Sequence, residues 1–148
     1  RSGNSLGDAP MNFPVTVDAS VFVNAFIPTE VGSDQSFEFV TNLRKAGIPL
    51  IQPTLFFPEV VASVARKKDN TEFALALAQD LRKFSGLTLI PLDEQLADLA
   101  SEIAAKHRLR GSDAVYAAVA LRFGTELLTL DKEQLERLPK VLTVKKPK

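Results

Sequence analysis

The chain has 148 residues, of which 45% are hydrophobic, so a single domain with its own hydrophobic core is expected. Its 18 basic and 18 acidic residues balance, which argues against binding of nucleic acid through net charge alone. There is no Cys and one His, His107, so disulfide frameworks, structural zinc sites and Cys nucleophiles are excluded, and any metal must be held by oxygen ligands, as Mg²⁺ and Mn²⁺ are.

The start of the chain and the length of its apolar runs limit where the protein can act. Residues 1–10 are small, polar and patternless, so we expect a cloning remnant or a disordered N-terminus there, and a folded domain over residues 11–148. No apolar run is long enough to span a bilayer, and no signal-peptide core lies near the start. Together with the absence of Cys, this predicts a cytoplasmic protein without a membrane partner.

Strands and helices are predicted to alternate along the chain. The apolar run from Phe13 to Val17 predicts a short strand buried on both faces, and it stops at Asp18. Further short strands are predicted over residues 48–51, 87–90, 126–130 and 141–144. Helices are predicted over residues 21–26, 34–46, 54–68, 71–84, 93–107 and 113–123, with a short one after residue 131.

Local signals and the order of the elements predict the fold class. Ser33 or Asp34 is expected to cap the second helix, and Gly47 to end it. The helix over residues 113–123 is apolar nearly all round, which is typical of a buried helix. Strands that alternate with helices predict right-handed crossovers and a mostly parallel sheet covered on both sides, which is a three-layer α/β/α fold.

Four acidic residues from separate segments are expected at one edge of this sheet. Asp18 and Asp131 each follow a strand, and Glu59 lies in the first turn of the helix after the second strand. Asp113 begins the helix that leads into the amino end of the fourth strand. Since ligands of open α/β sheets bind beyond the carboxyl ends of the strands, these carboxylates would face one site. Each also has an ordinary interpretation, with Asp18 or Ser20 as a helix cap and the others as charges favoured at helix N-termini.

Carboxylates gathered within several Å of one another point to a bound cation. They repel one another and raise one another's pKa unless a cation neutralises them. Metal-assisted hydrolysis of phosphodiesters uses such a cluster, because one or two divalent ions turn bound water into a nucleophile and stabilise the attacking and leaving oxygens. Mg²⁺ suits the site, since it keeps several waters and takes few carboxylates directly.

Four motifs, in this order and spacing, resemble those of a known family. They are VDAS at residues 17–20, PTL to PEVV at 53–61, GSDAVYAA at 111–118 and LLTLD at 127–131. The set is similar to the PIN domain and, more narrowly, to the small VapC-type toxin ribonucleases of type II toxin–antitoxin pairs. The resemblance implies a Rossmann-like sheet, Mg²⁺- or Mn²⁺-dependent cleavage of RNA by an endoribonuclease, and control by a cognate antitoxin protein.

The resemblance also implies which residues form the site. By position, the family's catalytic and metal-binding acids correspond to Asp18, Glu59, Asp113 and Asp131. Ser20 matches a small hydroxyl residue near the first acid, and Thr129 matches a hydroxyl that orients the site. Glu133 is a loose match to a further acid that many relatives carry after the fourth.

As members of such a nuclease site, the four acids and Arg110 would each have a role in binding metal or substrate. Asp18 and Asp131 would hold the principal ion, and Asp113 would share it or orient its water. Glu59 would accept a proton or bind through water. Arg110, just before the helix that carries Asp113, is a candidate for binding a substrate phosphate.

Partner surfaces are expected on two apolar helices. The helices that follow Asp34 and Asn70 are expected to form the homodimer and antitoxin surfaces, as the resemblance implies. Basic patches at residues 66–68, 108–110 and 145–148 are candidates for phosphate contacts, although such patches are more often a solvated face or a frayed chain end.

Two other classes of function stay open. A strand-terminal Asp serves as the nucleophile in haloacid-dehalogenase-like phosphatases and receiver domains, but these need a second Asp two positions on, where this chain has Ser20, or an acidic pair before the strand. A non-catalytic interaction module, with the acids only as caps, is the third class. Tyr116 could stack on a base, but it more often packs in a buried helix of this kind. His107 ends an amphipathic helix, where a histidine is mostly a partner of the helix dipole or a packed side chain.

Overall fold

Five parallel strands form the centre of the computed structural model, which describes residues 13–148. Their order across the sheet is β4-β3-β2-β5-β6, and every neighbouring pair runs parallel. The strands are β2 Val15–Val17, β3 Leu50–Pro53, β4 Leu87–Ile90, β5 Glu126–Leu128 and β6 Val144–Lys145. The expectation for residues 1–10, and with it a domain start at residue 11, lies outside the described residues.

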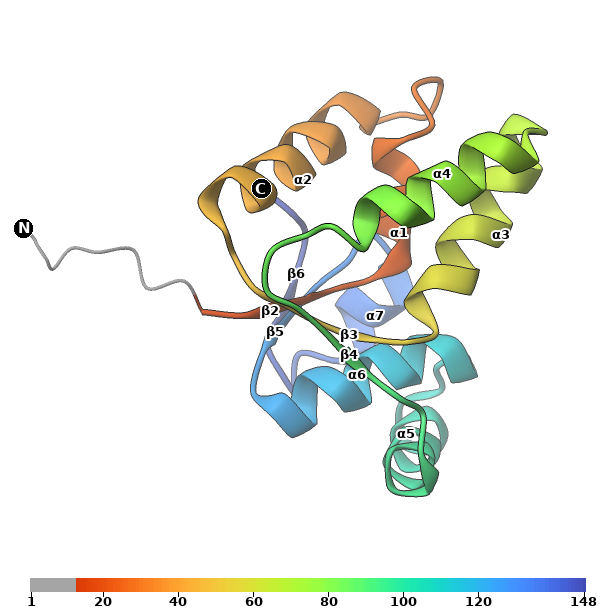
Figure 1. Cartoon of the computed structure of the whole chain (residues 1–148). Coiled ribbons are helices and arrows are strands. Elements are labelled where there is room, and N and C mark those ends of the chain that lie inside the picture. Colours follow the sequence, from red (N-terminus) through yellow and green to blue (C-terminus); the bar gives the residue numbers. More distant parts are fainter. Residues whose placement is uncertain (1–12) are drawn as a thin grey trace, which may run out of the picture.

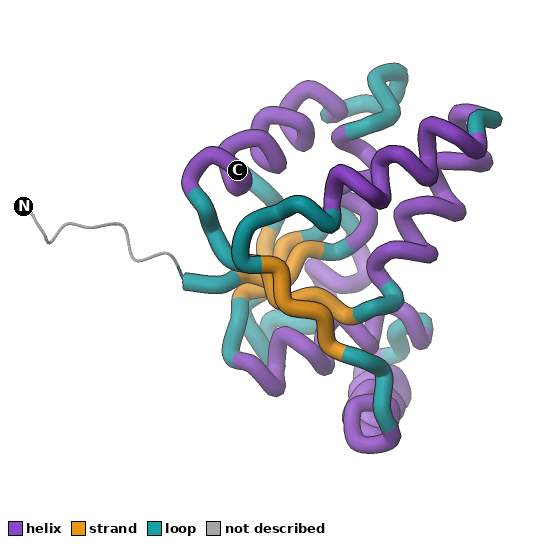
Figure 2. The backbone as a smooth tube through the Cα atoms, in the orientation of Figure 1, coloured by secondary structure: helices purple, strands orange, loops and turns teal. Residues whose placement is uncertain are grey.

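Helices cover both faces of this sheet. Within residues 13–148 they are α1 Ala19–Ala25, α2 Ser33–Ala46, α3 Phe56–Lys68, α4 Thr71–Leu81, α5 Glu94–His107, α6 Gly111–Phe123 and α7 Lys132–Arg137. Helices α1 to α4 lie on one side of the strands, and α5 and α6 lie on the other (Figures 1 and 2). The predicted three-layer fold is therefore confirmed. In the described part of the chain, no helix has the length and apolar character needed to cross a membrane.

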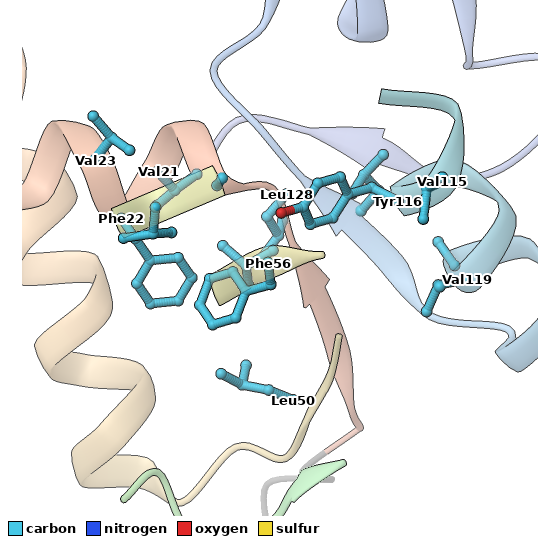
Figure 3. Close-up of a cluster of buried hydrophobic side chains, with 14 of the residues drawn as sticks. Val21, Phe22, Val23, Leu50, Phe56, Val115, Tyr116, Val119 and Leu128 are labelled. Carbon is cyan, nitrogen blue, oxygen red and sulfur yellow. The ribbon is translucent and has the colours of Figure 1, made fainter. Parts of the chain in front are cut away.

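The core forms where α1, α3 and α6 meet the sheet. Phe22 of α1 and Phe56 of α3 are buried, with ring centroids 4.9 Å apart in an edge-to-face arrangement. Residues 113–120 of α6 are all buried, as the apolar sequence of this helix predicts. Figure 3 shows the ring of Tyr116 reaching from α6 past Leu128 of β5, with its hydroxyl at the tip. Burial of α6 thus holds its N-terminus firmly in place.

Side-chain caps fix the starts of four helices. An oxygen of the cap residue accepts a hydrogen bond from a backbone N–H in the first turn, at distances of 3.1, 2.9, 2.8 and 3.1 Å for Asp18, Asn70, Asp93 and Asp131. Helix α2 differs, because it starts after Gly32 in the left-handed region at φ 81° without a side-chain cap. The expected cap at Ser33 or Asp34 is therefore wrong, and the hydroxyl of Ser33 donates instead to the carbonyl of Ala25 at 3.5 Å.

The turn that follows α2 displaces the start of β3. The backbone N–H of Ile48 donates to the carbonyl of Leu43 at 3.1 Å and closes the end of α2 after Gly47. The strand therefore covers Leu50–Pro53 and not residues 48–51. Helix α4 ends at Leu81, three residues before the predicted end.

The strands near the C-terminus are shorter than predicted. Strand β5 ends at Leu128 and not at residue 130, because the N–H of Leu130 is bonded to the hydroxyl of Ser20. The last strand covers Val144–Lys145 and not residues 141–144, because a turn after α7 uses the N–H groups of residues 141 and 142 to bond the carbonyl of Leu138. The first difference arises from a hydrogen bond between segments 110 residues apart, and the second from a local turn after α7.

Candidate active site at the carboxyl edge of the sheet

Asp18 follows β2 directly and is only 5% exposed. Its Oδ2 accepts hydrogen bonds from the backbone N–H of Ser20 at 3.1 Å and from the hydroxyl of Thr129 at 3.3 Å. Its Oδ1 accepts one from Nε2 of Gln134, also at 3.3 Å. Asp18 is therefore the cap of α1, and its carboxylate is at the same time fixed by donors from three segments of the chain.

Three of the four predicted acids line one cleft of about 830 Å³. Asp18 comes from the end of β2, Glu59 from the first turn of α3 and Asp113 from the first turn of α6. Ser20 and Arg110 line the same cleft. The parallel sheet explains this arrangement, because its strands end at one edge and α6, which leads back into the amino end of β5, must start at that edge.

The fourth acid, Asp131, lies in an adjoining hollow of about 500 Å³. It caps α7, where its Oδ2 accepts a hydrogen bond from the backbone N–H of Gln134 at 3.1 Å. Arg110 lines both hollows. Its Nε donates to Oδ2 of Asp113 at 3.2 Å, and its Nη2 lies 3.7 Å from Oδ1 of Asp131. The residue predicted to bind a substrate phosphate is thus paired with two of the acids.

The acids also influence one another electrostatically. Burial, followed by the negative charges of Asp18 and Asp131, raises the pKa of Asp113 to about 6, although Arg110 opposes the shift. Burial raises the pKa of Glu59 as well, and the charge of Asp18 adds to that rise. The edge therefore holds negative charges close enough to disfavour one another, which is the condition that attracts a cation.

Ser20 and Thr129 connect the two acids that follow strands. The hydroxyl of Ser20 accepts a hydrogen bond from the backbone N–H of Leu130 at 3.2 Å. The hydroxyl of Thr129 donates to Asp18 and accepts from the backbone N–H of Asp131 at 3.0 Å, and Thr129 is fully buried. These two hydroxyls thus fix the segment that carries Asp131 against the start of α1.

Comparison with known proteins gives the family. A family model described as "PIN domain" matches residues 15–141. The chain belongs to the PIN domain family. Over 115 residues it is 36% identical to Ribonuclease VapC49 of Mycobacterium tuberculosis H37Rv and to Ribonuclease VapC45 of the CDC 1551 strain. Each alignment covers 74% of this chain and 76% of the relative, so the resemblance carried by the four motifs is confirmed.

Solved structures of similar proteins share the fold of this PIN domain. The crystal structure of Mycobacterium tuberculosis VapC20, described as a sarcin-ricin loop cleaving toxin, has a TM-score of 0.67 at 15% identity and covers 80% of this chain and 90% of that chain. DNA-bound VapBC from Salmonella typhimurium has a TM-score of 0.62 at 18% identity, with 89% and 96% covered. At these identities the likeness shows a common fold.

Ribonucleases of the PIN domain family generally depend on a divalent metal. Within residues 13–148, no three His, Asp or Glu side chains converge as a set of direct ligands. The donors nevertheless have the right chemistry, because Mg²⁺ and Mn²⁺ prefer carboxylate and other oxygen ligands. Mg²⁺ keeps several of its waters and takes only one or two carboxylates directly, so acids spread around a cleft fit a hydrated ion.

A buried acceptor beside the acids supports this fit. In the part of the chain that the structure describes, Oε1 of Gln134 is buried without a hydrogen-bond partner, and Nε2 of the same side chain bonds Asp18. The buried hydroxyl of Tyr116 lies near Glu59, and burial, followed by the charges of Glu59 and Asp18, raises the pKa of Tyr116 well above its usual range. Buried unpaired groups are rare, so Oε1 of Gln134 indicates a place for water or a hydrated ion.

Two buried glutamines, Gln134 and Gln52, form hydrogen bonds at the carboxyl edge of the sheet, and neither is among the predicted site residues. Gln52 of β3 bonds both backbone groups of Val17, with Oε1 accepting at 2.6 Å and Nε2 donating at 2.8 Å. Strands β2 and β3 pair at a single position, Val15 with Leu50, so this side chain replaces the missing ladder just before Asp18. A polar residue inside a predicted buried strand is the signal that could have identified Gln52.

The remaining predicted side chains have structural roles. Tyr116 is fully buried, so it packs in its helix and cannot stack on a base. His107 is the last residue of α5, as expected from the amphipathic pattern. Glu133 lines the hollow of Asp131, and its Oε1 lies 3.5 Å from Nη1 of Arg137, with which it forms an ion pair.

A further cleft of about 650 Å³ lies at the amino end of the strands, away from the four acids. Apolar residues such as Phe39, Leu43 and Phe123 line much of it. Among the described residues that line it, the one acidic side chain is Glu126, which forms an ion pair with Lys145 at 3.1 Å. With no group of carboxylates from residues 13–148, this cleft is not a candidate for the hydrolytic site.

Proposed function

We propose that this PIN domain is an endoribonuclease that hydrolyses RNA phosphodiester bonds with Mg²⁺ or Mn²⁺, and that it is the toxin of a toxin–antitoxin pair. The observation that carries the proposal is the presence of Asp18, Glu59 and Asp113 in one cleft, with Asp131 in the hollow beside it. Burial, followed by the charges of Asp18 and Asp131, raises the pKa of Asp113, and the repulsion between these acids favours binding of a cation. The curated relatives that match the chain are named ribonucleases, which supports the same activity.

The proposed roles of the acids are those that the family resemblance implies. Asp18 and Asp131 would hold the ion, and Asp113 would share it or orient its water. Glu59, with its pKa raised by burial, accepts a proton or binds through water. A bound divalent ion supplies polarisation of the attacking water and neutralisation of phosphate charge. Arg110, when it is not paired with the acids, donates to a phosphate oxygen of the RNA.

The proposed partners are a cognate antitoxin and a second copy of the chain. Structures of similar fold include VapBC from Salmonella typhimurium bound to DNA and a toxin–antitoxin complex from Klebsiella pneumoniae, and these support an antitoxin. An apolar hollow of about 330 Å³ between α2 and α4 is lined by Phe26, Phe37 and Leu77, which supports a protein-binding role for these helices. A cytoplasmic location, which the absence of Cys favours, belongs to the same proposal.

The experiment that tests this function measures RNA cleavage and metal binding on the same protein. End-labelled RNA is incubated with the purified chain in Mg²⁺, in Mn²⁺ and in EDTA, while thermal unfolding is followed during a Mn²⁺ titration. We expect cleavage only with the ion, and a melting temperature that rises with Mn²⁺, because a ligand that binds the folded state stabilises it. An unchanged melting temperature at millimolar Mn²⁺ without cleavage would instead identify a non-catalytic interaction module.

A further inference from the structure

Gln134 contacts two of the four acids at once. Its side-chain Nε2 donates to Oδ1 of Asp18 at 3.3 Å, and its backbone N–H donates to Oδ2 of Asp131 at 3.1 Å. Gln134 is fully buried in the first turn of α7 and is anchored there by the hydrogen bond to the cap residue. Because one rigid residue binds both carboxylates, a movement of either acid relative to the other is coupled to the position of α7.

These two hydrogen bonds determine which carboxylate oxygens face the site. On Asp131, Oδ2 is used by the backbone of α7, and Oδ1 is the oxygen that faces Arg110. On Asp18, Oδ2 takes two donors from Ser20 and Thr129, while Oδ1 takes Gln134. The amide of Gln134 therefore restrains rotation of the Asp18 carboxylate about its Cβ–Cγ bond, and it leaves the remaining lone pairs of Asp18 in fixed directions.

The unpaired end of the same side chain adds a second observation. Oε1 of Gln134 is buried and has no hydrogen-bond partner among the described residues. A leucine or methionine at this position would fill a similar volume without leaving a buried acceptor unpaired, so packing alone gives no reason for an amide here. The contact with Asp18 explains the amide, because a leucine or methionine has no side-chain N–H to donate to this carboxylate.

We propose that Gln134 is a positioning residue whose side chain orients Asp18 for binding a divalent cation, at the point where its backbone N–H holds Asp131. This inference rests on the proposed function, since it concerns the same four acids. Residues that orient metal ligands without touching the metal typically contribute a factor of about 10 to 100 to metal affinity or activity. We therefore expect Gln134→Met to weaken Mn²⁺ binding by about tenfold or more, and to lower the stability of the fold in EDTA modestly, because the buried carboxylate of Asp18 loses one donor.

The test uses the full chain and measures two quantities for each variant. Isothermal titration calorimetry gives the dissociation constant of Mn²⁺, and thermal unfolding in EDTA gives the stability of the fold without the ion. Leu138→Met is the matched control, because Leu138 is also fully buried at the end of α7 but contacts none of the acids through a hydrogen bond. We expect wild-type Mn²⁺ affinity from this control, since exchanges between similar apolar residues are well tolerated.

A second variant keeps the test decisive if Gln134→Met does not fold. Gln134→Asn retains the amide but is shorter by one methylene, so its N–H no longer spans the distance to Asp18, and weaker Mn²⁺ binding is expected again. Wild-type Mn²⁺ affinity in either folded variant overturns the positioning role while leaving the proposed nuclease intact. Failure of the unmodified chain to bind Mn²⁺ would overturn the proposed function itself, so the two failures are distinguishable.

Discussion

The guanidinium of Arg110 lies against the carboxylate of Asp113, with 3.2 Å between Nε and Oδ2. The two residues are three positions apart, where α6 begins, and Arg110 is 73% exposed in its side chain whereas Asp113 is only 10% exposed. Arg110 also approaches Asp131, at 3.7 Å. This arginine therefore supplies positive charge to the same carboxylates that a divalent ion would neutralise.

Replacement of Arg110 is expected to separate metal binding from RNA binding. In Arg110→Gln the acids lose a positive charge that competes with the ion, so we expect a smaller dissociation constant for Mn²⁺, measured by isothermal titration calorimetry. Cleavage should nevertheless be slower, because the RNA phosphate loses the guanidinium that is proposed to bind it. The loss of stability in EDTA should be only about 0.5 to 1 kcal/mol, since the side chain is largely exposed and screened by water.

Arg108→Gln is the matched control for this experiment. Arg108 is also exposed and lies two residues away, but its Nη1 donates to the carbonyl of Ala105 at 2.6 Å and to none of the four acids. It should change neither Mn²⁺ affinity nor stability appreciably. Unchanged Mn²⁺ affinity in Arg110→Gln would contradict competition between the arginine and the ion.

The raised pKa of Asp113 predicts how stability depends on pH. Since this pKa is about 6 in the fold and its ordinary value is 3.8, the folded protein binds more protons than the unfolded chain between these values. The free energy of unfolding in EDTA should therefore fall as the pH rises from about 4 to 6, by up to about 3 kcal/mol from this group, and then level off. Urea unfolding across this range measures the effect.

Two comparisons test the assignment of this pH dependence to Asp113. The variant Asp113→Asn cannot titrate at this position, so its stability should lack the decline between pH 4 and 6. Stabilisation by Mn²⁺ should have the opposite dependence and grow as the pH rises through about 6, because the ion binds the deprotonated carboxylate. A decline that persists in the Asn variant would assign the titration to another group.

Asp18→Asn should abolish RNA cleavage without unfolding the protein. The new amide oxygen still accepts the hydrogen bond that caps α1, and the new amide N–H can donate to Oε1 of Gln134 after a rotation of that side chain. Removal of one negative charge also relieves repulsion on Asp113. We expect a melting temperature in EDTA equal to or slightly above that of the parent, and a loss of cleavage of about 100-fold or more. Cleavage at the parent rate would remove Asp18 from the site.

Gln52→Leu should destabilise the fold more than a surface change does. The substitution leaves the buried N–H and carbonyl of Val17 without partners, and each unpaired group costs about 1 to 3 kcal/mol. Urea unfolding should therefore show a loss of about 2 to 5 kcal/mol. The exposed Gln79→Leu on α4 serves as control and should change stability by less than about 0.5 kcal/mol. Equal stabilities would indicate that water replaces the glutamine.

Arg66 is expected to contact the RNA at the rim of the cleft. It lines the cleft of the three acids, as does its neighbour Lys67, which forms an ion pair with Glu30. Arg66→Ala should raise KM severalfold with a smaller effect on kcat, and it should reduce the salt dependence of RNA binding by about one phosphate contact. The control is Lys68→Ala, because Lys68 lies over the ring of Phe73 outside this cleft. Equal effects of the two variants would indicate a diffuse charge contribution only.

Most of the architecture follows from local patterns in the sequence. The apolar runs around Val17 and Leu127 predict buried strands, and the nearly uniform apolar character of α6 predicts a central helix. Element ends are predicted less well. The start of β3 depends on the local bond by which Ile48 closes α2 onto Leu43, and the end of β5 depends on the bond from Leu130 to the distant Ser20. Periodicity reports which residues are apolar, and it does not report where a distant donor interrupts a ladder.

The sequence by itself determined the order of strands and helices, and with it the edge at which Asp18, Glu59, Asp113 and Asp131 would meet. Only the tertiary structure decided which groups lie against these carboxylates: Arg110 pairs with two of them, and Gln134 donates a hydrogen bond to Asp18. The physical reason is that strand and helix propensities act over a few residues, whereas hydrogen bonds and charge pairs at this edge join side chains up to 116 positions apart. Their geometry exists only after the sheet and both helix layers have packed.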